Sequence, residues 1–144
     1  MFTSPDTLNT LRETIDHNGQ AEIAVVTGAG TPCFAHTIGN ANHGLPELLA
    51  IGAFMPGRIL QILAQIGHGM RKAGMAPDSE IDLGRTYPIR TRLAGPVARS
   101  RYTTDAGAYL GHDKYTVIQL LFADPSGRYP GEPGCDPRYD VQLI

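Results

Sequence analysis

Cysteine is scarce in this sequence, and neither sign of charge dominates it. The two cysteines, Cys33 and Cys135, lie far apart and lack the CxxC spacing that is typical of metal and redox sites. Such thiols suit a reducing compartment, so we expect a cytoplasmic protein. Twelve Lys and Arg residues stand against 14 Asp and Glu residues, which gives a formal net charge of -2. Without a basic excess to neutralise phosphates, nucleic acid is not an expected partner.

Long hydrophobic runs are also missing. No apolar stretch approaches the ~18 residues of a membrane-spanning helix, and residues 1–15 lack a basic segment followed by an apolar one. We therefore expect neither membrane insertion nor export by a recognisable signal. The 17 Gly and 11 Pro predict many short elements separated by turns. A chain of 144 residues fits a single domain over residues 1–144.

One long helix is predicted over residues 56–73. Pro56 suits the first helical position, and apolar residues then recur at steps of three and four, which indicates a broad buried face. Gly67 and Gly69 lie inside this helix, where each costs about 1 kcal/mol relative to alanine. Their presence favours close packing or a local bend.

The other elements are shorter. Ser4 and Pro5 suit an N-cap and a first helical position, so a helix is predicted over about residues 5–17. A further short helix is predicted near residues 105–110. Apolar or alternating segments predict strands at residues 21–27, 33–39, 47–51, 81–83, 87–93 and 115–123. The tail from about residue 124 to 144 is rich in Pro and Gly, which predicts an ordered wrap or a flexible tail without regular structure.

Together these elements predict an α+β fold with a mainly antiparallel sheet of about five or six strands. The first three strands follow one another closely, which favours an antiparallel meander. The strand over residues 115–123 is apolar at nearly every position and should be central. The long helix should cross one face, with the N-terminal helix beside it.

The densest group of potentially reactive side chains lies in residues 34–52, around a polar turn between two predicted strands. It contains His36, His43 and Glu47. Two imidazoles and a carboxylate can bind zinc or another divalent transition metal, and without metal they suit general acid–base chemistry. Their spacing matches no standard metal motif. The alternative is therefore a packed strand histidine, a turn histidine and a carboxylate that accepts backbone N–H groups.

Other polar segments give weaker signals. VTGAGTP at residues 26–32 lacks both the GxGxxG that opens a helix and the P-loop lysine, so a hairpin turn is favoured over nucleotide binding. The acidic residues of the tail are interrupted by prolines and do not fit a calcium loop. The second half also contains an arginine cluster, namely Arg85, Arg90, Arg92, Arg99 and Arg101. These guanidinium groups can hold an anionic ligand or pair with acids elsewhere.

Three blocks of sequence occur in a recognisable order, FAHTIG at 34–39, HGLPELLAIG at 43–52 and IQLLFADPSGRYPGEPGCD at 118–136. In this order they resemble the bacterial domain-of-unknown-function 4262 family, over about residues 21–140. The residues that match its pattern are Thr37, Gly39, Pro46, Glu47, Gly52, Gln119, Asp124, Gly127 and Pro130. Two positions depart from the pattern, because Asn40 replaces an apolar residue and Gly131 replaces an aromatic one.

The resemblance implies a bacterial cytoplasmic domain, and the family has no established activity. It gives weight to the polar residues that match, so the candidate binding residues are Thr37, Glu47, Gln119 and Asp124. Since the chain has no complete catalytic motif, the sequence favours a binding module for a small molecule or a partner protein. Its cleft is predicted between the turn at 43–47 and the tail at 124–136.

The alternative function is a small metal-assisted or acid–base enzyme, hydrolase-like, that uses His36, His43 and Glu47. No cofactor is predicted for the binding module, whereas the enzyme would use a divalent transition metal. The sequence leaves the oligomeric state open and is compatible with a homodimer.

Expectations for single residues follow from these patterns. His36 should be buried on the apolar face of its strand, because side chains alternate between the faces. Gln119 should use its amide to fix the tail at residues 124–130, since a buried amide needs partners. Glu47 should emerge in a defined direction after Pro46. Its carboxylate can then accept backbone N–H groups, pair with His43 or meet a ligand.

Overall fold

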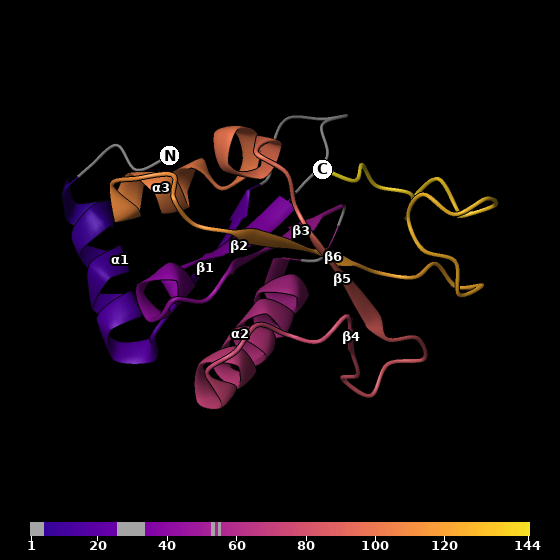
Figure 1. Cartoon of the computed structure of the whole chain (residues 1–144), viewed down its shortest axis with the longest axis horizontal. Helices are drawn as coiled ribbons and strands as arrows, with labels where there is room; N and C mark the ends of the chain where they lie inside the picture. Colours follow the sequence, from indigo (N-terminus) through magenta and orange to yellow (C-terminus); the bar gives the residue numbers. More distant parts are fainter. Residues whose placement is uncertain (1–4, 26–33, 53, 55) are drawn as a thin grey trace.

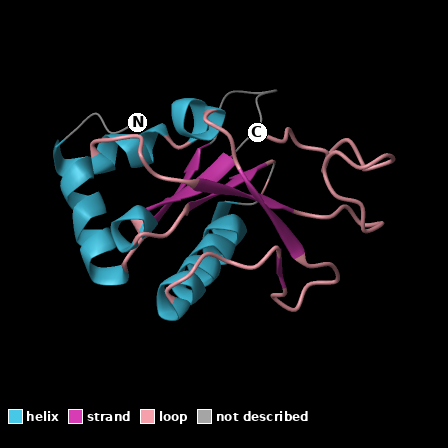
Figure 2. Cartoon of the chain, in the orientation of Figure 1, coloured by secondary structure: helices cyan, strands magenta, loops and turns pink. Residues whose placement is uncertain are grey.

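The computed structural model describes residues 5–25, 34–52, 54 and 56–144. In chain order its helices and strands are α1 (Pro5–Asn18), β1 (Ala21–Val25), β2 (Phe34–Ile38), η1 (Asn40–His43), β3 (Glu47–Ile51), α2 (Pro56–Ala73), β4 (Glu80–Ile81), β5 (Ile89–Leu93), η2 (Ala98–Tyr102), α3 (Thr104–Leu110) and β6 (Val117–Leu121). After β6 the chain runs as loop (Figure 2). The VTGAGTP segment lies outside the described residues. None of the described helices is long and apolar enough to span a bilayer.

The six strands form one sheet in the order β1-β2-β3-β6-β5-β4. β1, β2 and β3 make the predicted antiparallel meander, and β6, β5 and β4 also pair antiparallel. The two halves join through the parallel pair of β3 and β6, in which Glu47 lies opposite Val117 and Ala50 opposite Leu120. β6 is therefore central, as its apolar sequence predicts. The α+β class and the mainly antiparallel sheet are confirmed.

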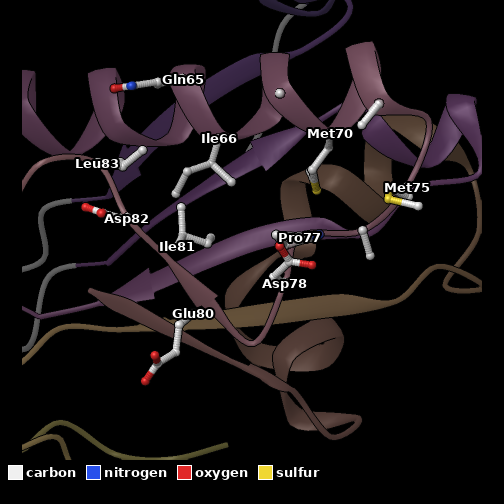
Figure 3. A pocket seen from close by; sticks show the side chains of 13 residues that line it. Gln65, Ile66, Met70, Met75, Pro77, Asp78, Glu80, Ile81, Asp82 and Leu83 are labelled. Carbon is white, nitrogen blue, oxygen red and sulfur yellow. The ribbon is translucent and has the colours of Figure 1, made fainter. Parts of the chain in front are cut away.

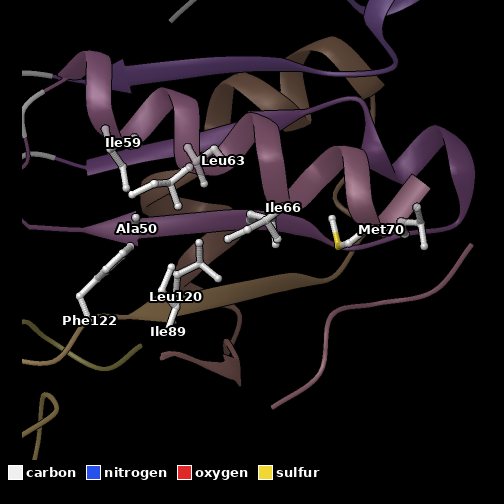
Figure 4. Close-up of a cluster of buried hydrophobic side chains, with 12 residues drawn as sticks. Ala50, Ile59, Leu63, Ile66, Met70, Ile89, Leu120 and Phe122 are labelled. Atoms are coloured by element: carbon white, nitrogen blue, oxygen red, sulfur yellow. The ribbon is translucent and has the colours of Figure 1, made fainter. Parts of the chain in front are cut away.

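Helices cover both faces of this sheet, with α2 on one side and α3 on the other (Figure 1). The first hydrophobic cluster lies under α2. Figure 4 shows Leu63 and Ile66 of this helix facing Ala50 and Leu120 of the two central strands. The helix has the predicted bounds and crosses the sheet as expected.

The second hydrophobic cluster lies on the opposite face, where Leu49 and Val117 pack with residues of α1, η2 and α3. The N-terminal helix was expected beside α2, but its buried residues Leu11 and Ile15 belong to this second cluster. α1 lies on the face opposite to α2, because the side chains of each strand alternate between the two faces of the sheet. The central strands are apolar at successive positions, so each face of the sheet needs a cover.

α2 comes very close to the start of β1 at Gly67. The side-chain amide of Gln20, which is 2% exposed, lies against this glycine, and a Cβ atom at position 67 would collide with it. The close packing predicted for Gly67 is therefore confirmed. Gly69 is different, because no neighbouring atom outside the helix backbone lies within 4 Å of a Cβ atom built there.

Gly67→Ala should therefore destabilise the protein by about 1–3 kcal/mol, because the new methyl group must displace the Gln20 amide. That amide donates a hydrogen bond of 3.0 Å to the carbonyl oxygen of Leu63. Urea unfolding followed by circular dichroism measures the change. Gly69→Ala is the matched control and should raise stability by about 1 kcal/mol, since alanine is the better helix former. Equal stability of the two variants would contradict the close contact at Gly67.

Candidate functional site

The carboxylate of Glu47 is fully buried at the start of β3 and is surrounded by hydrogen-bond donors. It accepts the backbone N–H groups of Gly39 (3.1 Å), Asn40 (3.3 Å) and Ala41 (3.0 Å), and the hydroxyl group of Thr37 (2.8 Å). Burial raises the pKa of Glu47, and these donors act in the opposite direction. Of the three roles that the sequence leaves open, the geometry corresponds to the acceptor of backbone N–H groups.

A larger polar network continues from this turn to α2. The Nδ2 atom of Asn40 donates to Oε1 of Gln20 at 2.8 Å, and the Arg71 guanidinium donates to both side chains at 2.7 Å. Asn40 also donates to the hydroxyl oxygen of Thr37 at 3.3 Å. These bonds satisfy Asn40 at a position where the family pattern has an apolar residue. The network joins the residue before β1 to η1 and α2, and its donors and acceptors are used within the fold.

The two histidines do not join Glu47 in one site. His36 is fully buried on the face of the second hydrophobic cluster, which confirms its predicted position, and its Nδ1 atom lies 3.1 Å from the carbonyl oxygen of Thr37. Burial lowers the pKa of His36, although the Thr37 carbonyl and the charge of Asp105 act in the opposite direction.

His43 is exposed in η1. Among the described residues, no group of three or more His, Cys, Asp or Glu side chains is placed to hold a metal ion. His36, His43 and Glu47 therefore form no metal-binding group among the described residues. The physical reason is that His36 turns into the core, whereas His43 lies in a turn that faces solvent.

Asp124 organises the loop that follows β6. Its carboxylate accepts the backbone N–H groups of Asp136 (2.8 Å), Arg128 (2.9 Å) and Ser126 (2.9 Å), and the Ser126 hydroxyl at 2.7 Å. These donors hold the pKa of Asp124 well below its usual range, with the Asp136 N–H the largest cause. Of the two predicted states of the tail, this bonding corresponds to an ordered wrap.

Gln119 fixes the end of the chain, as its buried amide predicts. Its Nε2 atom donates to the carbonyl oxygen of Gln142 at 2.8 Å, and its Oε1 atom accepts the N–H of Ile144 at 3.1 Å. Arg92 donates to the main-chain oxygen of the same Ile144. The segment it holds is therefore 142–144 instead of the predicted 124–130. Gln119 lies in the middle of β6, where the last residues return across the sheet, whereas the Asp124 loop begins beyond the strand's end.

The predicted cleft between the turn at 43–47 and the tail at 124–136 does not form among the described residues. β3 and β6 are parallel, so the turn lies at their amino ends and the tail follows the carboxyl end of β6. At about 3.3 Å per residue, each strand of five residues separates the two segments by more than 10 Å. The candidate residues Glu47 and Asp124 consequently belong to different ends of the sheet.

A cleft does open at the carboxyl ends of β3 and β6, where α2 begins. It has two compartments, one of about 440 Å³ with mostly apolar walls and one of about 530 Å³ with more polar walls. Residues that line the first compartment include Ile51, Phe54, Ile59, Ile62, Leu120 and Val141. The two compartments share the lining residues Arg58, Arg85, Phe122 and Tyr139. Asp124 lines the polar compartment, but its carboxylate is already bound to the loop.

Three guanidinium groups line this cleft. Arg138 pairs with Asp136 at 2.8 Å, whereas Arg58 and Arg85 pair with no carboxylate of the described residues. Arg85 lies over the ring of Phe122, with 5.4 Å from its Cζ atom to the ring centroid. The predicted arginine cluster includes Arg85 but not Arg58, because a lone arginine at the start of a helix has no distinctive pattern.

The rest of the predicted arginine cluster is dispersed. Arg90 pairs with Glu80 at 3.3 Å and with Glu132 at 3.5 Å. Arg92 holds the end of the chain, and Arg99 donates to the carbonyl oxygen of Tyr115 at 3.3 Å. Arg101 is exposed on η2. Of the five arginines of the predicted cluster, Arg85 alone lines the cleft.

Comparison with known proteins gives a family and no function. A family model described as "Domain of unknown function (DUF4262)" matches residues 14–136. No curated protein and no solved structure matches the chain.

Glu47→Gln should lower stability by about 1–3 kcal/mol, because an amide NH₂ would replace an acceptor that faces backbone N–H groups. The melting temperature measured by circular dichroism should fall accordingly. Glu13→Gln, on the exposed side of α1, is the matched control and should leave the melting temperature unchanged. An unchanged melting temperature in Glu47→Gln would show that the carboxylate does not organise the turn.

Asp124 should contribute to acid unfolding. Its folded-state pKa lies below the unfolded value of about 3.9, so its stabilisation is fully present above that pH and is lost as the pH falls below it. Asp124→Asn should therefore be less stable than the wild type at pH 7, and the difference in urea midpoint should shrink between pH 5 and pH 2. A difference that stays constant over this range would contradict a charged Asp124 as the acceptor in the loop.

Proposed function

The chain belongs to the DUF4262 family, and from its own residues we propose that it is a binding module for a small amphipathic organic anion. The ligand occupies the cleft at the carboxyl ends of β3 and β6. The observation that carries this proposal is the junction of an apolar and a polar compartment at Arg58 and Arg85. An anionic head group sits at this junction, and an apolar body extends into the apolar compartment.

The apolar compartment supports the body of such a ligand. Its walls come from the ends of the central strands, from the first turn of α2 and from the returning tail, with Leu120 and Val141 among them. A volume of about 440 Å³ falls within the usual range for small-molecule sites. Burying apolar ligand surface there gains roughly 25 cal/mol per Å².

The guanidinium groups support the negative charge of the head. Arg58 and Arg85 present planar, permanently charged donors that suit a carboxylate or a phosphate. Neither is neutralised by a carboxylate of the described residues, so an incoming anion does not have to displace an internal partner. The start of α2 adds the partial positive charge of a helix amino terminus to the same region.

The proposed site differs in place from the cleft predicted from the sequence. A binding module for a small molecule near the tail agrees with this cleft, whereas the turn at 43–47 is not part of it. Gly52 and Pro130, two residues that match the family pattern, line the cleft together with Arg58. The pattern residues Thr37, Gly39 and Glu47 instead build the polar turn at the other end of the sheet.

Isothermal titration with octanoate and octyl phosphate tests the proposal, with butyrate as the probe that keeps the head and shortens the body. Arg58→Gln and Arg85→Gln should each weaken octanoate binding by about tenfold, because each removes a charge-assisted contact. Butyrate should bind more weakly than octanoate to the wild type, since less apolar surface is buried.

Arg101→Gln is the matched control, because Arg101 is an exposed arginine that does not line the cleft. It should bind octanoate as the wild type does. Absence of saturable binding of both eight-carbon anions would overturn the proposal. Undiminished binding by a variant that carries both Arg58→Gln and Arg85→Gln would also overturn it.

A further inference from the structure

A second hollow lies along the C-terminal half of the long helix, between α2 and the short strand β4. It has a volume of about 380 Å³. Figure 3 shows Ile66 and Met70 of α2 on one wall, with Ile81 facing Ile66 from the other. The floor is therefore apolar, and it continues from the hydrophobic cluster under α2.

Three carboxylates lie on the β4 side of this hollow, and no basic side chain of the described residues lines it. The lining residues include Asp78, Glu80 and Asp82, but no Lys, Arg or His. Glu80 is partly neutralised by Arg90 of the neighbouring strand at 3.3 Å. Asp82 uses one oxygen to accept the N–H of Gly84 at 2.9 Å. The carboxylate of Asp78 makes no hydrogen bond or ion pair with the described residues.

Gly69 is an exposed residue on the α2 side of the hollow. It lies in the interior of α2, where glycine is the least favourable residue after proline. Gly67 is required by the contact with Gln20, but nothing in the fold fills the space beside Gly69, which lines the hollow. A side chain at position 69 would therefore project into open space at the wall of the hollow.

From the apolar floor, the acidic β4 side and the open α2 wall, we propose that this hollow binds a small amphipathic organic cation. The apolar body lies on Ile66, Met70 and Ile81, and the cationic head lies beside Asp78 and Asp82. A volume of about 380 Å³ suits a small molecule, whereas a peptide helix about 10 Å across would need a longer groove. The charge of the lining favours a cation, because Asp78 and Asp82 have no cationic partner among the described residues.

This site is separate from the arginine-lined cleft, and the two hollows share no lining residue. They present opposite charges, so they should select opposite ligands. The second site does not depend on the function proposed for the first, and either can fail without the other.

Titration with octyltrimethylammonium tests the second site. The wild type should bind this cation saturably, and Gly69→Leu should abolish binding because the new side chain fills the hollow. Its melting temperature should equal or exceed that of the wild type, since leucine is a better helix former than glycine and has open space there. Asp78→Asn and Asp82→Asn should each weaken binding about two- to fivefold, as expected for partly exposed charges.

Gly57→Leu is the matched control, because Gly57 is an exposed glycine of the same helix with open space around it and does not line the hollow. It should bind the cation as the wild type does. The variant with both Arg58→Gln and Arg85→Gln should also retain cation binding, which separates this site from the first. Undiminished cation binding by a folded Gly69→Leu protein would overturn the proposal, and so would the absence of saturable cation binding by the wild type. The proposal would also be overturned if Asp78→Asn and Asp82→Asn weakened octanoate binding as much as they weaken cation binding.

Discussion

The parallel pairing of β3 with β6 is the constraint on which the rest of the structure depends. It joins residues 47–50 to residues 117–120 and so unites an N-terminal meander with a C-terminal set of antiparallel strands. A parallel pair needs a long crossover, and this crossover contains α2, β4, β5, η2 and α3. Because the paired strands are buried on both faces, helices must cover both, and the two hydrophobic clusters follow.

Buried polar groups at the two ends of this pair then fix the connections. Glu47 holds the turn that enters β3, and Asp124 holds the loop that leaves β6. Each carboxylate accepts several backbone N–H groups that would otherwise be unsatisfied, which is costly in a protein interior. Both residues are candidates in the sequence because they match the family pattern with polar side chains. In the structure both carboxylates accept hydrogen bonds from backbone N–H groups, which leaves few free acceptors for a ligand.

The surface groups with unused charge lie elsewhere. Arg58 and Arg85 border an apolar compartment at the carboxyl ends of the central strands, and Asp78 and Asp82 border another beside α2. Each hollow combines apolar walls with charged groups that have no ion-pair partner among the described residues, and this combination is the basis of the two proposed ligands. The net charge of the chain, -2, hides this separation because the two signs nearly cancel.

The sequence by itself determined the elements and the class of fold, because helix caps, apolar periodicity and glycine breaks act locally along the chain. The bounds of α2, the three-strand meander, the central β6 and the burial of His36 all follow from such local rules. Tertiary structure alone decided the direction of β6 relative to β3, and hence that the turn at 43–47 and the tail lie at opposite ends. It also decided the cleft, since Arg58, Arg85 and Val141 come from three separate segments that no local pattern connects. Long-range pairing sets such positions, and residue spacing in a single sequence carries no record of it.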